Sequence, residues 1–337
     1  MLRVGVPEIG LIFLPLALPL AHFSAKSIPR PTWCTLALLL TMIVIPWIQA
    51  GLLASGLEVE WKKTFRLSPT RFPLLLGSTS TSWEMTEEYK EGRSWDRYIP
   101  EDVEVKARVL FIHGGSWRNG TRKDYPEIFQ YLAGRGYEVV SISYALSGEA
   151  PYPAGMNDLS VAVDKLSGMD DVPLFLMGRS SGGHMALLAS YQNADKVSGV
   201  VGIYAPVDMT WSYENPSNPN VLDSEEAIVE FLEFPPNEAE ARYREASPIE
   251  QISTAGPPTL LIHGQADCLV YHRQSEMLSE RLEERGVSHF LLSLPWMEHG
   301  GDITLTGPTG RISAWTIEAF LDSVLTDEAH KREDGQV

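Results

Sequence analysis

Cysteine is nearly absent from this chain of 337 residues, which contains only Cys34 and Cys268. Two cysteines exclude a disulfide framework and a cysteine-rich metal site, and Cys268 is expected to be a small buried filler. Basic residues are also scarce, because 27 lysines and arginines face 44 aspartates and glutamates, which gives a net charge of −17. The chain is therefore not expected to bind nucleic acid, since phosphate contacts require clustered lysine and arginine.

Cofactor and metal motifs are missing as well. The sequence has no H-E-x-x-H zinc motif, no Walker loop, no G-x-G-x-x-G and no cysteine pair at ligand spacing. We therefore expect neither a cofactor nor a metal ion. The remaining composition, with 44% apolar and 21% charged residues, is typical of a globular protein. It does not indicate an oligomeric state.

Charge is almost missing from the N-terminus. Residues 31–57 form 27 consecutive uncharged positions, which is long enough for a membrane-spanning helix of about 20 residues. A shorter apolar stretch over 9–25 is interrupted by Pro15 and Pro19. We therefore predict a membrane anchor over residues 1–57, with one or two spans. A buried hairpin packed on the soluble domain is the alternative.

Basic residues near these stretches bear on the side of the membrane, because cytoplasmic loops are enriched in lysine and arginine. If both stretches span, the flanks on the side of the following domain hold Arg3, Lys62, Lys63 and Arg66, against Lys26 and Arg30 in the short loop. This count slightly favours a cytoplasmic domain. If only the second stretch spans, the two loop residues place the domain outside.

From about residue 107, short apolar runs alternate with amphipathic stretches of helical length. Near-continuous apolar runs are typical of parallel strands that helices cover on both faces. The runs predict strands at 107–113, 137–144, 172–177, 197–204, 257–263 and 287–294. The stretches between them predict helices at 125–136, 157–168, 181–193 and 273–286. This alternation indicates an α/β fold with a doubly wound, mostly parallel sheet.

About fifty residues between two of these strands lack the pattern. They predict a helical lid insertion over about 208–254, within a catalytic domain over 58–326 and before a solvated, frayed polar tail over 327–337. Four aromatic residues of the insertion either line an acyl pocket or pack the insertion onto the sheet: Trp211, Tyr213, Phe231 and Phe234.

The sequence Gly178-Arg179-Ser180-Ser181-Gly182 is a G-x-S-x-G motif between a predicted strand and a predicted helix. A nucleophile elbow requires this strand–turn–helix context, because the glycines allow a sharp turn that exposes the serine hydroxyl. Ser180 is therefore the predicted nucleophile. A glycine-rich helix start with an N-cap serine is the alternative.

A serine nucleophile needs a base and an acid. His299 lies in a glycine-flanked loop after the last predicted strand and is the best candidate for the base. Asp267 follows another strand by four residues and is the predicted acid, with Asp208 as the fallback. His184, one turn into the helix after Ser180, is expected to point sideways from the hydroxyl. The order Ser180, Asp267, His299 matches the order of triad residues in this architecture.

An oxyanion hole is predicted from the loop His113-Gly114-Gly115-Ser116-Trp117, which follows the first clear strand. Its backbone N–H groups, together with that of Ser181, are suited to bind a tetrahedral oxyanion. All of these segments follow the carboxyl ends of strands, where open α/β sheets bind their ligands.

The motifs HGGSW, GRSSGGH, HGQAD and EHGG, in this order, resemble the α/β-hydrolase superfamily. The similarity covers about residues 85–325 and points to the carboxylesterase/lipase branch with an HGG oxyanion motif, which includes hormone-sensitive-lipase-like and feruloyl-esterase-like members. It implies that Ser180, Asp267 and His299 are nucleophile, acid and base, that Gly115, Ser116 and Ser181 donate to the oxyanion, and that Asp158 is structural. The chain has HGGS where many members have HGGG.

We therefore expect a membrane-anchored serine hydrolase that cleaves small-molecule carboxylic esters through an acyl-enzyme. An amidase, formamidase-type or peptidase activity on the same triad is one alternative. A membrane-tethered binding protein without activity is another, because a fold alone does not prove a function.

Overall fold

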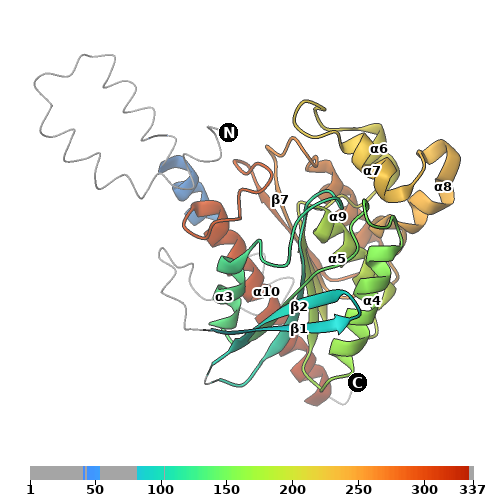
Figure 1. Cartoon of the computed structure of the whole chain (residues 1–337). Coiled ribbons are helices and arrows are strands. Elements are labelled where there is room, and N and C mark those ends of the chain that lie inside the picture. The colour runs from blue at the N-terminus through green and yellow to red at the C-terminus, as the bar shows by residue number, and fades with distance from the viewer. Residues whose placement is uncertain (1–40, 42–43, 54–81, 102, 334–337) are drawn as a thin grey trace, which may run out of the picture.

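The computed structural model describes residues 41, 44–53, 82–101 and 103–333 (Figure 1). Its strands are β1 (Ser82–Lys90), β2 (Arg93–Pro100), β3 (Ala107–Ile112), β4 (Tyr137–Ile142), β5 (Leu174–Arg179), β6 (Gly199–Ile203), β7 (Thr259–Gly264) and β8 (His289–Leu294). They form one sheet of eight strands in the order β1-β2-β4-β3-β5-β6-β7-β8. The pairs β1·β2 and β2·β4 are antiparallel, and the others are parallel.

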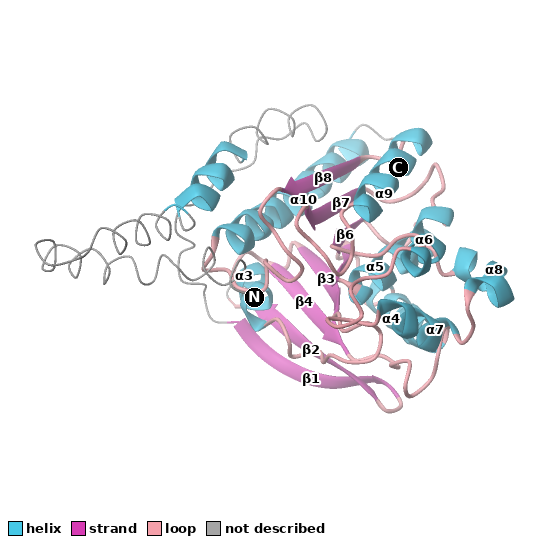
Figure 2. Ribbon diagram, turned by 90° about the horizontal axis from the view of Figure 1, so that it is seen from above, coloured by secondary structure: helices cyan, strands magenta, loops and turns pink. Residues whose placement is uncertain are grey.

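Helices cover both faces of this sheet, as Figure 2 shows from above. On one face lie α3 (Pro126–Ala133) and α10 (Pro308–Glu333), and on the other lie α4 (Ala154–Ser167), α5 (Ser181–Gln192) and α9 (Arg273–Arg285). Side chains of β3 alternate between the two cores, with Val109 and Phe111 on the α10 face and Leu110 and Ile112 on the α5 face. Because both faces of the sheet are covered, all six residues of β3 are buried, and all but Arg108 are apolar.

The predicted α/β sheet is confirmed, and the six parallel strands lie within two residues of their predicted bounds. The hairpin β1–β2 was not predicted, because its sequences SWEMTEEYK and RSWDRYIP carry many charges. The predicted frayed tail is wrong for residues 327–333, which continue α10 as a helix. Its last four residues lie outside the described part of the chain.

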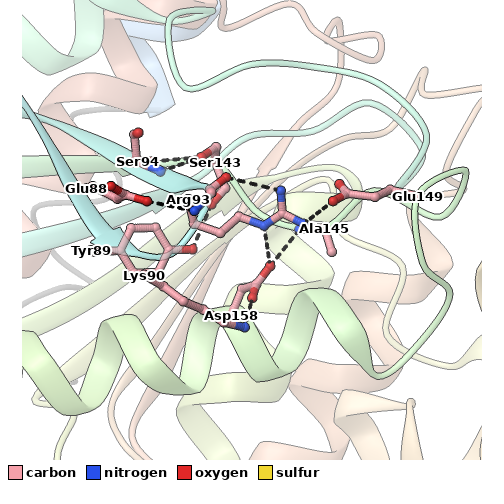
Figure 3. A network of polar contacts seen from close by, with 10 residues as sticks. Glu88, Tyr89, Lys90, Arg93, Ser94, Ser143, Ala145, Glu149 and Asp158 are labelled. Atoms are coloured by element: carbon pink, nitrogen blue, oxygen red, sulfur yellow. Dashed lines mark hydrogen bonds and ion pairs between the residues drawn. The ribbon is translucent and has the colours of Figure 1, made fainter.

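Asp158 on α4 ties the hairpin to the rest of the domain (Figure 3). Its Oδ1 accepts a hydrogen bond from Lys90 Nζ at 2.5 Å, and its Oδ2 accepts from Arg93 Nε and the Ala145 amide, each at 2.8 Å. Burial raises the pKa of this carboxyl, but the hydrogen bonds from Lys90 and Arg93 lower the pKa by more than burial raises it. The net pKa therefore lies below the usual range. These contacts are structural, in agreement with the role that the resemblance implies.

The segment between β6 and β7, predicted as a lid insertion, contains α6 (Met209–Glu214), α7 (Ser224–Leu232), α8 (Pro236–Glu245) and a 3-10 turn (Pro248–Glu250). Asp208, the fallback acid, is the N-cap of α6, and its carboxylate accepts from the Trp211 amide at 2.9 Å. Asp208 therefore caps a helix, and the carboxylate that bonds to the predicted base is that of Asp267.

Most of the predicted anchor over 1–57 lies outside the described residues. Residues 44–53 are helical and pack near the start of α10, where the Arg311 guanidinium lies 5.0 Å from the Trp47 ring centre. In the described part of the chain, no helix has the length and apolar character needed to cross a membrane.

Candidate active site

Ser180 lies at the sharp turn between β5 and α5. Its backbone has φ 54° and ψ −126°, a conformation that is strained for any residue with a side chain. A Cβ on Gly178 would lie 2.2 Å from the Gly182 carbonyl oxygen, and a Cβ on Gly182 would lie 2.2 Å from that of Ile112. Only glycine fits at either position, so the G-x-S-x-G pattern follows from the tightness of the turn.

The structure brings the three predicted triad residues together. Ser180 Oγ lies 3.0 Å from His299 Nε2, and His299 Nδ1 lies 2.7 Å from Asp267 Oδ2. Because a carboxylate only accepts, Nδ1–H donates to Asp267, which leaves Nε2 free to accept the Ser180 hydroxyl. This is the tautomer that a general base for Ser180 requires.

Asp267 is buried and fully hydrogen-bonded. Its Oδ1 accepts from the amides of Leu269 at 2.8 Å and Val270 at 3.0 Å, and its Oδ2 lies 3.4 Å from His263 Nε2. Burial raises the pKa of the carboxyl, but hydrogen bonds from His263 and His299 outweigh it and hold the pKa well below its usual range. The carboxylate therefore stays charged and can stabilise an imidazolium at His299.

The predicted oxyanion residues Gly115, Ser116 and Ser181 line the same cavity as Ser180 and His299. The loop lies close to Ser180, because a Cβ on Gly114 would lie 2.7 Å from the Arg179 carbonyl oxygen and 3.3 Å from the Ser180 Cβ. Gly115, Ser116 and Trp117 have successive positive φ angles of 126°, 56° and 58°. Two of these are non-glycine residues, so the loop holds a strained shape beside Ser180.

His184 fixes this loop to the lid insertion and takes no part in the triad. Its Nδ1 accepts from Trp117 Nε1 at 3.2 Å, and its Nε2 donates to the Ala246 carbonyl at 2.7 Å. Trp117 in turn stacks on Phe231 of α7, with ring centres 4.7 Å apart. Burial lowers the pKa of His184 to about 4, so its ring is neutral near pH 7.

A cavity of about 320 Å³ opens in front of Ser180. Of the four aromatic residues considered for an acyl pocket, only Trp211 lines it. Phe231 packs on Trp117, Tyr213 lies against Tyr243, and Phe234 is 46% exposed. The expectation of a buried Cys268 is wrong, because its position directly after Asp267 is exposed.

Three residues near the triad were not predicted. The Tyr204 ring centre lies 4.4 Å from that of His299, and Arg179 forms a buried ion pair with Asp302. Arg179 directly precedes Ser180 and Asp302 follows His299 by three residues, but Arg179 and Asp302 are 123 positions apart in the sequence. No local pattern could pair them.

The eight-stranded sheet, the elbow and the order of the triad define an α/β-hydrolase. Solved structures agree with the fold: an esterase from Pyrobaculum calidifontis superposes with a TM-score of 0.63 at 22% identity, over 80% of this chain and 92% of that one. A truncated carbohydrate esterase from gut microbiota gives a TM-score of 0.61 at 24% identity, over 77% of this chain and 99% of that one. The BD-FAE family model matches residues 95–282, and the chain belongs to this family.

Among curated proteins, Esterase LipC of Mycobacterium tuberculosis is 30% identical over 243 residues, which are 64% of this chain and 58% of LipC. The probable carboxylic ester hydrolase LipM of the same organism is 26% identical over 271 residues, which are 74% of this chain and 62% of LipM. The matched segments thus span about three fifths of these relatives. The predicted superfamily and esterase branch are confirmed.

Proposed function

We propose that this protein is a serine hydrolase that cleaves carboxylic esters through an acyl-enzyme on Ser180. The observation that carries the proposal is the continuous hydrogen-bonded chain Ser180–His299–Asp267 at the cavity, with distances of 3.0 and 2.7 Å. Relatives named as esterases support an ester as the substrate. A binding protein without activity would have no use for this ordered triad and its strained serine.

In the first half of the reaction, Ser180 Oγ attacks the ester carbonyl carbon while its proton moves to His299 Nε2. The carbonyl oxygen becomes an oxyanion, for which Gly115, Ser116 and Ser181 supply backbone N–H groups. The carbon–oxygen bond to the alcohol then breaks, and His299 returns the proton to the departing alkoxide. The product is an ester between Ser180 and the acyl group.

In the second half, His299 Nε2 takes a proton from a water molecule, whose oxygen attacks the acyl carbon. A second oxyanion forms in the same hole and collapses, and the proton on His299 passes to Ser180 Oγ. The carboxylic acid leaves and the free serine is restored. Asp267 keeps its charge throughout and orients His299.

The cavity indicates small, uncharged substrates. Its volume of about 320 Å³ is at the lower end of the range for pockets that bind drug-sized ligands. Apolar side chains form much of its wall: Trp211, Val221, Leu222, Ile228, Leu269, Val270 and Ile303. In the described part of the chain, no aspartate, glutamate, lysine or arginine lines it. A charged acyl group would lose its hydration there without gaining a lysine, arginine, aspartate or glutamate of opposite charge.

Hydrolysis of p-nitrophenyl esters from acetate to palmitate by the full chain tests this proposal. We expect the rate to peak at short acyl chains, and Ser180→Ala to lower kcat by about 10⁴-fold or more. Ser190→Ala, which removes a buried hydroxyl from α5, the helix that follows Ser180, is the matched control and should leave the rate unchanged. Ester hydrolysis that survives Ser180→Ala contradicts the proposal. Activity confined to small amides supports the amidase alternative instead.

We also propose that residues 1–57 attach the catalytic domain to a membrane. The uncharged run over 31–57 supports this. Extraction of membranes with alkaline carbonate should leave the full chain in the pellet, whereas a protein released to the supernatant would contradict the anchor. Protease accessibility in sealed vesicles would then distinguish the cytoplasmic domain expected for two spans from the outside domain expected for one.

A further inference from the structure

A buried pair of opposite charges lies directly behind the triad. Arg179 and Asp302 are each 1% exposed, and both Nε and Nη2 of Arg179 lie 2.7 Å from Asp302 Oδ2. Arg179 is the last residue of β5, immediately before Ser180. Asp302 follows His299 by three residues in the loop between β8 and α10. The pair therefore joins the two segments that carry the nucleophile and the base.

Aromatic side chains enclose the pair. The Arg179 guanidinium lies 4.5 Å from the ring centre of Tyr125 and 5.7 Å from that of Phe111, at distances typical of cation–π contacts. Burial and the negative charge of Asp302 raise the pKa of Tyr204 well above its usual range. The centre of the Tyr204 ring also lies 4.4 Å from that of the His299 ring. Tyr204 therefore lies next to both the buried ion pair and the imidazole.

Stability alone is a poor explanation for this pair. Arg179 Nη1 is buried and has no hydrogen-bond partner within the described part of the chain, and both contacts of Arg179 go to the same oxygen of Asp302. A buried ion pair with unsatisfied polar atoms is commonly no more stable than apolar side chains of the same volume. A role at the neighbouring site accounts for the position of the pair better.

The pair connects the loop that carries His299 to the end of β5. Before His299, the Met297 carbonyl accepts from the Ala266 amide at 3.1 Å. After His299, Gly300 has φ 80° and Gly301 follows it, so the backbone there is intrinsically permissive. Asp302 is the first residue after these glycines, and its carboxylate accepts a hydrogen bond from Arg179, the residue before Ser180.

We propose that Arg179 and Asp302 are positioning residues that set the distance and orientation between His299 and Ser180. This inference rests on the proposed function. A misplacement of about 1 Å between reacting groups can lower a rate about 100-fold. Loss of the tie therefore affects the proton transfer from Ser180, whereas the cavity that binds the ester keeps its lining.

Two single variants and one double variant of the full chain test the pair. Asp302→Asn removes the negative charge of the pair, Arg179→Met removes the guanidinium, and Arg179→Met/Asp302→Leu removes both charges. For each single variant we expect kcat to fall about 10- to 100-fold while KM stays within about threefold. The rate at which a fluorophosphonate labels Ser180 should fall in parallel. Arg179→Lys keeps the charge and should restore part of kcat.

The double variant separates positioning from folding. It leaves no unpaired buried charge, so we expect its thermal midpoint to return towards that of the unmodified protein while kcat stays at least about tenfold low. Recovery of full kcat together with stability would overturn the proposal, as would single variants with unchanged kcat. If the single variants do not fold, the double variant alone decides.

Glu138→Gln is the matched control, because Glu138 belongs to another buried ion pair, with Arg108, far from Ser180. It should lower the thermal midpoint and leave kcat unchanged, and a loss of kcat equal to that of Asp302→Asn would overturn the proposal. The unmodified protein and Ser180→Ala, assayed alongside, test the esterase proposal separately. If neither hydrolyses an ester, the esterase proposal fails, and the labelling rate of Ser180 still reports on the pair.

Discussion

The two ends of the parallel strands each hold a buried arginine, and the two arginines differ in how completely they are bonded. At the amino ends, Arg108 of β3 donates from Nε to Glu138 at 2.9 Å, from Nη1 to the Leu166 carbonyl at 3.2 Å and to Asp170, and from Nη2 to Asp170 at 3.1 Å. At the carboxyl ends, Arg179 contacts one oxygen of Asp302 and has a nitrogen without a partner among the described residues.

This difference separates stability from function within one sheet. The network around Arg108 also includes Arg97, whose Nε donates to Glu138 Oε1 at 2.6 Å, so each oxygen of that carboxylate has a partner. A fully bonded network rigidifies the amino ends of the strands. The carboxyl ends instead hold a strained serine and an incompletely bonded ion pair, which are features of sites that act on substrates.

The largest effect on stability is expected at the amino ends. Arg108→Met leaves Glu138 buried with one of its two cationic partners removed, and should lower the free energy of unfolding by about 3–5 kcal/mol. Urea denaturation measures this change, and kcat of the folded fraction should stay within about twofold. If the variant had an unchanged free energy of unfolding but a lower kcat, the amino ends would contribute to catalysis as well. The contrast between the two ends of the sheet would then be wrong.

A second effect concerns pH and arises at the carboxyl ends. Because the pKa of His184 is about 4 in the folded protein and about 6.5 in the unfolded chain, the unfolded state binds more protons between these values. Stability therefore rises with pH across this window, and is lost as the pH falls from about 6.5 to 4, by up to about 3 kcal/mol.

Thermal midpoints recorded across this pH window measure the effect. In His184→Gln the contribution should disappear, which flattens the pH dependence of the midpoint. An identical slope in the variant and the unmodified protein would show that other groups cause the loss. Such a result would mean that His184 does not make the carboxyl ends of the sheet more sensitive to pH than the amino ends.

The smallest effect is expected in the lid insertion. Trp211→Ala removes a wall of the cavity and should raise KM for the preferred ester about 5- to 10-fold with little change in kcat, because binding contacts are lost and the triad is untouched. Tyr213→Ala, two positions along α6, is the control, since Tyr213 lies against Tyr243 and does not line the cavity. Equal changes in both variants would indicate a general loosening of the insertion.

Short-range patterns in the sequence were enough to predict the sheet and the triad segments. The apolar runs predict parallel strands because both faces of β3 are buried, and Gly178 and Gly182 mark the elbow because no Cβ fits there. The hairpin β1–β2 lacks such a pattern, since its charged residues bond elsewhere, as Arg93 does to Asp158. The pairing of Arg179 with Asp302 depends on how β5 and the His299 loop meet in space.

The backbone of Ser180 has one further consequence. With φ at 54°, this position suits glycine better than any residue with a side chain. Ser180→Gly would therefore remove the proposed nucleophile and relieve about 1 kcal/mol of strain. A population selected for heat resistance alone would therefore gain by losing this serine. Under the proposed function, the chain keeps a reactive hydroxyl at this position at a cost in thermal stability.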